Sequence, residues 1–405
     1  MDTEAEGRRL LAFARRSALP GLGFGWLDDR GDVDPSEPVQ TWITARMTHV
    51  FALAALRGEP EAAELARLGV RALTDGPLRD TEHPGWLGAV MRSGAPAAER
   101  KLAYDHAFVA LAASSATAAD VPEARALLGD AVTVLDRHFL DAAGRVVDGY
   151  ARDLAEPEGY RGANGSMHTV EATLALGDVL GEPRWHRIAL GIAEHLIHQV
   201  AAGRGHRLPE HFDERWTPLP EYNVDHPADQ FRPYGVTPGH LLEWARLLLQ
   251  LESAHPDAPS WLLEDARALF ARAVEIGWGV DGAPGFVYTT DWADRPVVRD
   301  RMHWVQAEAI GAAAALARRT GERRYADLER DWWEFADRHF VDRLPGAGSW
   351  FHELDPDNRP VAGVWSGKPD VYHAYQATLL TRLPIAPSLA TQLAGLRAGP
   401  ETPPG

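Results

Sequence analysis

The chain has 405 residues, of which 45% are hydrophobic and 24% charged, a composition typical of globular proteins. Its formal net charge of -17 argues against nucleic acid and against an anionic membrane surface as partners. Because it contains no cysteine, disulfides, thiolate catalysis and cysteine-ligated zinc are excluded.

The first stretch, MDTEAEGRRLLAFARR, is acidic and amphipathic and lacks the basic and apolar regions of a signal peptide. No apolar run along the chain reaches the length of a transmembrane helix. We therefore expect a cytoplasmic protein that does not contact a membrane. A helical pattern covers residues 2–19, and Pro20 ends it before a glycine-rich turn.

From residue 41 the chain alternates between two kinds of helical stretch. The first kind is rich in alanine and has small side chains; it covers 41–56, 103–118, 166–180, 238–253, 303–320 and 370–383. The second kind carries charges on one side only, which is typical of outer helices; it covers 61–73, 123–140, 184–200, 260–278 and 324–341. The segment 386–399 fits a last helix of this second kind.

This alternation repeats at intervals of roughly 60 to 70 residues, longer than common solenoid periods. Six inner helices and their outer partners predict an all-α fold, an (α/α)6 barrel built as a double ring of antiparallel helix hairpins. An open solenoid would need polar capping repeats at both ends, which the sequence lacks. We predict one catalytic domain over residues 1–398 and a C-terminal tail over 399–405.

Longer connections lead from each outer helix to the next inner helix. They contain strand-like or hairpin-like pieces at 85–90, 144–153, 207–226, 285–292 and 348–356. Since all these connections end at inner-helix N-termini, we predict short strands in the loops on one face of the barrel. The active site is expected on that face.

The first turns of the inner helices carry polar and aromatic side chains for which an alanine-rich core helix has little structural need. They are Trp42, Arg46, Tyr104, Asp105, His106, His168, Glu171, His240, Glu243, Trp304, Gln306, Glu308, Tyr372, His373 and Tyr375. Because such polar and aromatic side chains occur at the same end of all six inner helices, we predict a central polar pocket there. The 14 tryptophans suit a pocket that stacks sugar rings.

His240 and Glu243 stand in the stretch YGVTPGHLLEW, and His168 and Glu171 repeat their spacing. A spacing of three residues puts both side chains on one helix face. Two such pairs allow a carboxylate-bridged metal site, but the usual order in helix bundles is Glu before His. No HExxH motif is present, so we predict neither a metal nor another cofactor.

Glycosidase chemistry is an alternative that requires two carboxylates around one bond, for which Glu210, Glu243 and Asp291 are candidates. The predicted inner ring is dominated by histidine instead. An imidazole with a pKa near 6.5 both accepts and donates protons near neutrality, which favours proton transfer on a sugar. A serine hydrolase has no support because Gly-x-Ser-x-Gly is absent.

Six motifs resemble the N-acylglucosamine 2-epimerase superfamily: TWITARMTHVFALAA, YRGANGSMHTVEATLAL, PEHFDERWTPLPEYN, YGVTPGHLLEWARL, GSWFHELD and KPDVYHAYQ. The resemblance runs from about residue 21 to residue 387. It is closest to the aldose–ketose isomerase branch, which acts on mannose and on sulfoquinovose. It implies an (α/α)6 barrel and isomerisation through a cis-enediol without a metal.

The resemblance also implies a role for each matching residue. His240 helps to open the sugar ring with Glu243 as its partner, and His373 moves the proton between C2 and C1. The implied substrate-binding residues are Arg46, Tyr104, Asn164 and His168, with Trp42, Trp304 and Trp365 as walls.

The substrate expectation depends on three positions where the sulfosugar branch has an arginine and two glutamines. Here they are Gln230, His352 and Pro369. Without the arginine a sulfonate loses its charge-assisted partner. We therefore expect an uncharged monosaccharide, D-mannose interconverting with D-fructose, and D-lyxose with D-xylulose as a side activity. Gln230 and His352 are counted among the substrate-binding residues.

Two alternatives stay open within the same fold. One is a sulfoquinovose isomerase. The other is a 2-epimerase for N-acylglucosamine or cellobiose, which returns the proton to the opposite face of C2. The sequence is compatible with a monomer or a homodimer.

Overall fold

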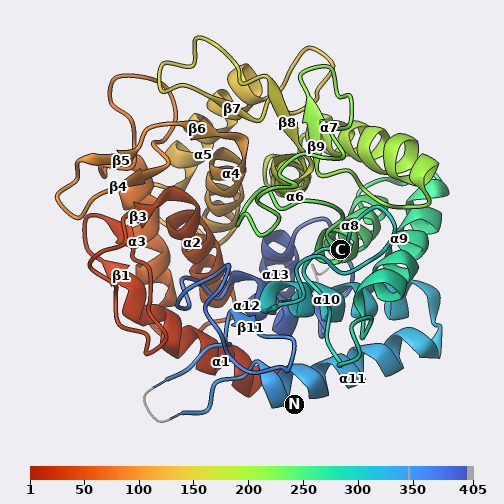
Figure 1. Cartoon of the computed structure of the whole chain (residues 1–405). Helices are drawn as coiled ribbons and strands as arrows, with labels where there is room; N and C mark the ends of the chain where they lie inside the picture. The colour runs from red at the N-terminus through yellow and green to blue at the C-terminus, as the bar shows by residue number, and fades with distance from the viewer. Residues whose placement is uncertain (345–346, 399–405) are drawn as a thin grey trace, which may run out of the picture.

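The computed structural model describes residues 1–344 and 347–398, and its helices form two concentric rings (Figure 1). The inner ring consists of α2 (Thr41–Leu56), α4 (Ala103–Ala118), α6 (Ala163–Leu180), α8 (Pro238–Ser253), α10 (His303–Thr320) and α12 (Tyr372–Leu380). Each packs on the next and α12 packs on α2, so the ring closes. The predicted (α/α)6 barrel is confirmed.

Four inner helices have the bounds that the sequence predicts. The other two differ: α6 begins at Ala163 rather than at residue 166, and α12 covers only part of 370–383. Nearly every side chain of α2 is buried, as expected for a helix surrounded by others. Within the described ranges, no helix is long and apolar enough to cross a membrane.

Five outer helices each pack on the inner helix that precedes them. They are α3 (Ala62–Thr74), α5 (Ala124–Val134), α7 (Pro183–Ala193), α9 (Trp261–Gly277) and α11 (Arg323–His339). Helices α5 and α7 continue into the π-helical turns η2 (Leu135–Phe139) and η3 (Glu194–Ala201), and 3₁₀ turns follow α1 and η3 at η1 (Arg15–Ser17) and η4 (Ala202–Arg204). Helix α11 buries one face, as its charge pattern predicts.

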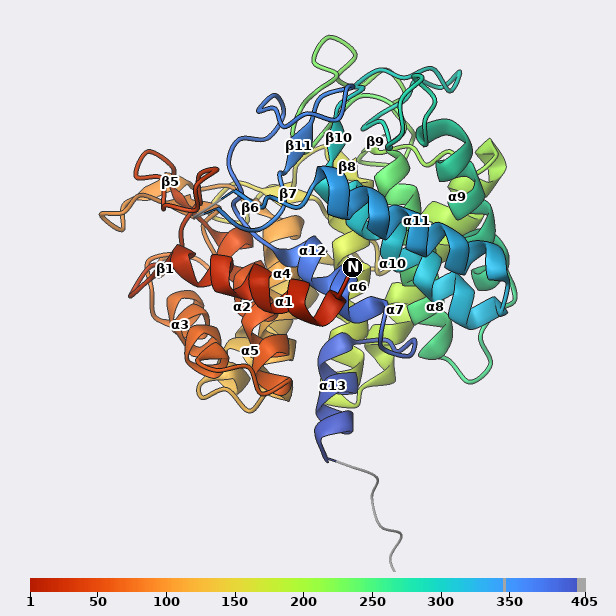
Figure 2. The same ribbon diagram turned by 90° about the horizontal axis from the view of Figure 1, so that it is seen from below.

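The sixth outer position is filled by the N-terminal helix α1 (Thr3–Ala14), which packs on α12. The C-terminal helix α13 (Leu389–Ala398) instead packs on α2, α4 and α6 and lies at the end of the barrel away from the long loops (Figure 2). The prediction of a last outer helix at 386–399 is therefore wrong, because α1 already occupies that place. The tail predicted at 399–405 lies outside the described residues.

The strands are short and gather in the loops on one face, as predicted. They are β1 (Ala18–Leu19), β2 (Gly23–Phe24), β3 (Val39–Gln40), β4 (Ala89–Val90), β5 (Pro96–Ala98), β6 (Lys101–Leu102), β7 (Gly149–Tyr150), β8 (Tyr160–Gly162), β9 (His211–Asp213), β10 (Arg301–Met302) and β11 (Glu353–Leu354). Strands β3, β6, β8 and β10 each end directly before an inner helix. Each pairs antiparallel with a strand of the next long loop, β4, β7, β9 and β11 in turn. This pairing ties the inner-helix N-termini together at one rim.

Two glycines allow the chain to pass close to its neighbours where the loop enters α8. Gly235 has a φ of 95°, and a Cβ there would lie 2.1 Å from the Thr290 carbonyl oxygen. A Cβ on Gly239 would lie 2.5 Å from the Trp304 ring. Pro238 supplies the first helical residue, where its missing N–H costs nothing. The turn therefore fixes His240 at the start of α8, directly against α10.

Candidate active site

A pocket with an empty volume of about 550 Å³ opens at the centre of the inner ring, at the loop end. Its lining comes from all six inner helices or the loops before them: Arg46, Tyr104, Asn164, His168, Gln230, Phe231, Pro233, His240, Glu243, Tyr288, His303, Trp304, His352, Trp365, Asp370 and His373. Every residue predicted to be catalytic or substrate-binding lies here except Trp42. The structure thus brings together residues separated by more than 300 positions in the chain.

Trp42 stands behind the pocket wall. Its ring packs edge-on against Tyr104 and Trp365, with centroids 6.4 and 6.2 Å away. The prediction that Trp42 is a wall of this pocket is therefore wrong: its neighbours cover it. Pro369, the third position of the substrate expectation, is also absent from the lining.

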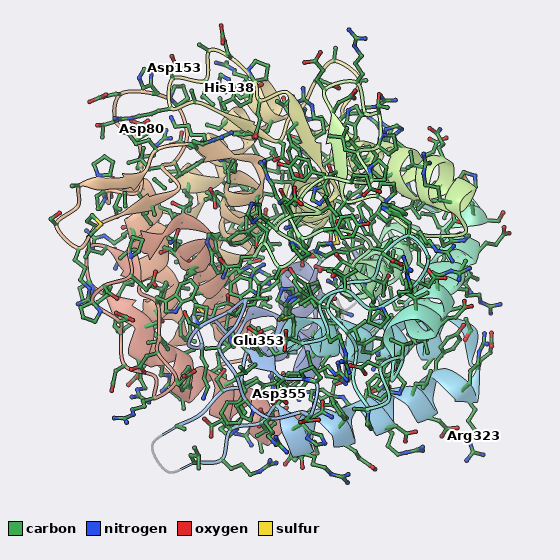
Figure 3. The ribbon with its side chains drawn as sticks, in the orientation of Figure 1. Asp80, His138, Asp153, Arg323, Glu353 and Asp355 are labelled. Carbon is green, nitrogen blue, oxygen red and sulfur yellow. The ribbon has the colours of Figure 1, made fainter. Side chains whose placement is uncertain are left out.

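Trp365 lies in a loop and needs a fixed position to act as a wall. The carboxylate of Glu353, labelled in Figure 3, accepts hydrogen bonds from the backbone N–H groups of Gly363 and Trp365 at 3.1 and 2.7 Å. Since Glu353 belongs to β11, the strand pairing before α10 also positions this aromatic side chain.

His373, in the first turn of α12, forms the first of two histidine–glutamate pairs. Its Nδ1 lies 2.8 Å from Oε1 of Glu308, and the other Glu308 oxygen accepts a hydrogen bond from Nε of Arg246 at 2.9 Å. An ionised carboxylate only accepts, so Nδ1–H donates and Nε2 keeps its lone pair. Burial lowers the pKa of His373 well below its ordinary value. The result is a neutral, oriented base.

His240 forms the second pair, but not with the predicted partner. Its Nδ1 lies 2.9 Å from Oε2 of Glu210, which belongs to the loop before β9. Glu243 instead accepts from Arg246 at 3.4 Å and lies 3.9 Å from Nδ1 of His168. The predicted His240–Glu243 partnership is wrong, because Glu243 lies one turn deeper and faces other helices, whereas His240 at the rim meets the loop.

The indole of Trp304 links the two pairs. Its ring centroid lies 5.2 Å from that of His240 and 5.8 Å from that of His373. A flat apolar face beside two imidazoles suits the apolar C–H face of a sugar, with proton-transfer groups at its edges.

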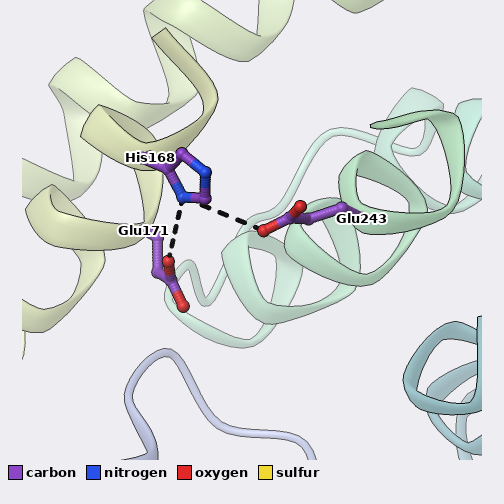
Figure 4. A group of neighbouring side chains, drawn as sticks. All are labelled: His168, Glu171 and Glu243. Carbon is purple, nitrogen blue, oxygen red and sulfur yellow. Dashed lines mark hydrogen bonds and ion pairs between the residues drawn. The ribbon is translucent and has the colours of Figure 1, made fainter. Parts of the chain in front are cut away.

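Below the pocket, three buried carboxylates surround one buried guanidinium. Glu171, Glu243 and Glu308 all interact electrostatically with Arg246, and Figure 4 shows the first two beside His168. Burial and the neighbouring Glu308 charge raise the pKa of Glu243 well above its ordinary value. Burial opposes ionisation of Glu171 too, but its His168 hydrogen bond and the Arg246 charge lower its pKa overall. Burial also raises the pKa of Glu308, so the cluster resists carrying three negative charges at once.

Two groups of side chains here have ligand atoms close enough to hold a metal ion, all within 4.8 Å of one another. The first is His168, Glu171 and Glu243, and the second is Glu243, Glu308 and His373. Arg246 touches a carboxylate of each group and already supplies positive charge. The absence of a metal remains a prediction.

Arg46 is the one cationic side chain in the described lining of the pocket, and its charge is compensated. Its guanidinium lies 3.3 Å from Asp370 and donates a hydrogen bond to the Tyr104 hydroxyl at 2.8 Å. Aromatic rings surround it, the nearest being that of Phe108 with its centroid 4.3 Å away. It can offer further N–H donors to a sugar oxygen, but little net charge.

His303 and His352 stack on one another with ring centroids 3.7 Å apart. Burial lowers the pKa of His303 to about 4 and that of His352 well below its ordinary value, so both rings are neutral. Nε2 of His303 and Nδ1 of His352 have no hydrogen-bond partner among the described residues.

The sequence missed five lining residues: Phe231, Pro233, Tyr288, His303 and Asp370. Two of them had a usable signal. His303 is the first residue of an inner helix, and Asp370 belongs to the KPDVYHAYQ motif. The other three lie in long loops, where the sequence contains no periodicity that could orient a side chain.

The family model of N-acylglucosamine 2-epimerase (GlcNAc 2-epimerase) matches residues 23–377. The chain belongs to this family. It is 55% identical to a D-mannose isomerase of Thermobifida fusca, over 96% of both chains. It is 52% identical to a D-mannose isomerase of Pseudomonas cannabina pv. alisalensis, over 96% of this chain and 94% of that one.

Solved structures agree with this membership. A crystal structure of a D-mannose isomerase superposes with a TM-score of 0.86 at 28% identity, covering 94% of this chain and 96% of that chain. The resemblance seen in the motifs is confirmed, and with it the expectation that the chain is an enzyme of the isomerase type.

Proposed function

We propose that this enzyme interconverts D-mannose and D-fructose by metal-independent proton transfer through a cis-enediol. The observation that carries the proposal is the neutral His373, oriented by Glu308 and facing a pocket with a second histidine across Trp304. The similarity to D-mannose isomerases at 55% and 52% identity supports the same substrate.

The proposed reaction begins with ring opening. Nε2 of His240 takes the proton of the anomeric hydroxyl and delivers it to the ring oxygen as the bond between C1 and the ring oxygen breaks, which gives the open-chain aldehyde. Glu210 holds the imidazole at Nδ1, so Nε2 is the atom that exchanges the proton.

The central step moves one proton between two carbons. Nε2 of His373 takes the proton from C2 and leaves an enediolate with its charge on the aldehyde oxygen O1. The O2 hydroxyl then passes its proton to O1, and the imidazolium of His373 returns its proton to C1 as the O2 carbonyl forms, which gives the ketone of fructose. The Arg46 and Tyr104 donors stabilise the developing charge on oxygen.

The pocket favours an uncharged sugar over a sulfonate or phosphate. Its one cation, Arg46, is paired with Asp370, and the neighbouring His303–His352 stack is neutral. An anionic group entering here would lose its hydration without gaining an unpaired cation. D-Lyxose, which lacks only the terminal CH2OH, should be converted to D-xylulose more slowly.

Product analysis tests the proposal. The enzyme is incubated separately with D-mannose, D-lyxose, cellobiose and sulfoquinovose, and products are resolved by chromatography. Fructose from mannose is the expected result. Glucose without a ketose would establish a 2-epimerase instead, and turnover of sulfoquinovose alone would establish the sulfosugar alternative.

A further inference from the structure

A second pocket, with an empty volume of about 1140 Å³, adjoins the first at the loop end of α4 and α6. Tyr104, Asn164 and Phe231 line both pockets and form their common wall. The rest of its lining is largely apolar or aromatic and includes Leu102 and Trp42. The proposed isomerisation assigns no role to this space.

Asp105, in the first turn of α4, lines this second pocket with only 3% of its surface exposed. Its carboxyl group has no hydrogen bond or ion pair within residues 1–344 and 347–398. Burial disfavours the charged carboxylate and no hydrogen bond or positive charge in the part of the chain that the structure describes offsets this effect, so the pKa of Asp105 rises to about 8. The next residue of the helix, His106, is a buried polar side chain whose polar atoms do have partners. Both its ring nitrogens are hydrogen-bonded to backbone groups.

The other charged side chains at this pocket are already paired. Arg232 lies 3.3 Å from Asp148 and also contacts Glu158, which binds Arg100 at 2.7 Å as well. Glu99, at the mouth, accepts from Arg152 at 3.0 Å. Asp105 is therefore the acid in the described lining of this pocket that lacks a partner, and it is the most deeply buried one.

We propose that this second pocket binds an organic ammonium ion, a primary amine carried on an apolar body. The ammonium reaches the carboxylate of Asp105, and the body packs on Trp42, Phe231 and Leu102. In a site of low dielectric, a full positive charge compensates a buried carboxylate far better than a hydroxyl group does. The rings of Trp42, Tyr104 and Phe231, which pack edge-to-face with one another, offer further attraction to a cation.

Calorimetric titration of the whole chain with a matched pair of probes tests this site. Cyclohexylmethylamine carries the ammonium, and cyclohexylmethanol has the same body with a hydroxyl group. We expect the amine to bind at least tenfold more tightly than the alcohol. Asp105→Asn should abolish this preference, whereas Glu99→Gln, which removes an exposed charge at the mouth, should change it less than twofold. Equal affinity for both probes would overturn the proposal, and so would an unchanged preference in Asp105→Asn.

The wild-type chain gives a second test that depends on no variant. Titratable and charged groups near Asp105 are Tyr104 on its own helix and Glu99, Arg100, Asp148 and Arg232 on the facing loops. An alkylamine stays protonated between about pH 6.5 and pH 8.5, so the carboxyl group sets the change. Affinity for the amine should rise roughly 20-fold over this range as Asp105 ionises. A flat profile would overturn the proposal. Because binding is measured directly, neither outcome depends on mannose turnover.

Discussion

The two histidine–glutamate pairs of the pocket have similar geometry, yet the carboxylates are held differently. Glu308 lies on an inner helix, and its two oxygens accept from His373 and from Arg246. Glu210 lies in a loop, and its Oε1 has no hydrogen-bond partner among the described residues. A guanidinium thus fixes the His373 pair in place, whereas a single hydrogen bond orients His240. This difference fits a division of labour in which His373 performs the carbon proton transfer and His240 assists ring opening.

The largest effect is expected from removing the base of the better-held pair. His373→Ala should lower kcat for mannose by about 10³- to 10⁴-fold, the usual range for loss of a general acid–base group. Sugar binding measured by calorimetry should change little, because His373 is one of many lining groups. A variant with near-normal kcat would remove the central role from this pair.

Substitution of the second pair should distinguish ring opening from the carbon step. His240→Ala should lower kcat/KM for mannose by about 10²-fold. The same variant should keep its kcat/KM for D-glyceraldehyde within about threefold of wild type, because this three-carbon aldose cannot close a ring. Equal losses on both substrates would show that His240 acts in the carbon step as well.

The two carboxylates themselves form a matched pair for stability. Glu308→Gln leaves the buried Arg246 without a charged partner on that side and should lower the free energy of unfolding by about 3 kcal/mol. Glu210→Gln breaks no ion pair with an arginine and should cost about 1 kcal/mol or less. Urea unfolding monitored by circular dichroism measures both. If both variants lost a similar free energy of unfolding, the contact with Arg246 would not distinguish the two carboxylates.

The sequence predicted the barrel because its signals are local and repeated. Alanine-rich and amphipathic stretches alternate, and each inner helix carries functional residues near its N-terminus, so the helix bounds and the position of the pocket could be predicted together. Helix α1 could not be assigned to the outer ring, because its partner α12 lies more than 350 residues further on. No local sequence pattern predicts that the two ends of the chain pack together to close the ring.

At the site, the sequence did not predict which carboxylates pair with His240 and His373. Spacing suggested Glu243 for His240, since residues three apart share a helix face. The actual partners stand 30 and 65 residues away from their histidines, in a loop and on the neighbouring helix. Glu308 was visible as a first-turn carboxylate and Glu210 as a candidate acid, but only the folded chain pairs each with its histidine.

The pH dependence of turnover should show that His373 is neutral over a wide range. Burial lowers its pKa well below its ordinary value, so protonation does not remove the base until the pH falls far below 6.5. We expect kcat/KM for mannose to fall less than twofold from about pH 8 to pH 6, whereas an unperturbed imidazole would cause a loss of about fourfold. A loss of fourfold or more over this range would contradict a buried, neutral His373 as the base.

The smallest effect is expected from metal removal. This experiment tests only one of the two histidine–glutamate pairs. One of the two candidate ligand groups contains Glu308 and His373, whereas Glu210 and His240 belong to neither group. Of the two pairs, only the His373 pair could therefore share a metal. Because Arg246 already supplies positive charge to the carboxylates there, exhaustive dialysis against EDTA should change kcat by less than about twofold, and added Mg²⁺ or Mn²⁺ should not raise it. A loss that a divalent ion reverses would show that the metal, rather than the guanidinium, completes the His373 pair.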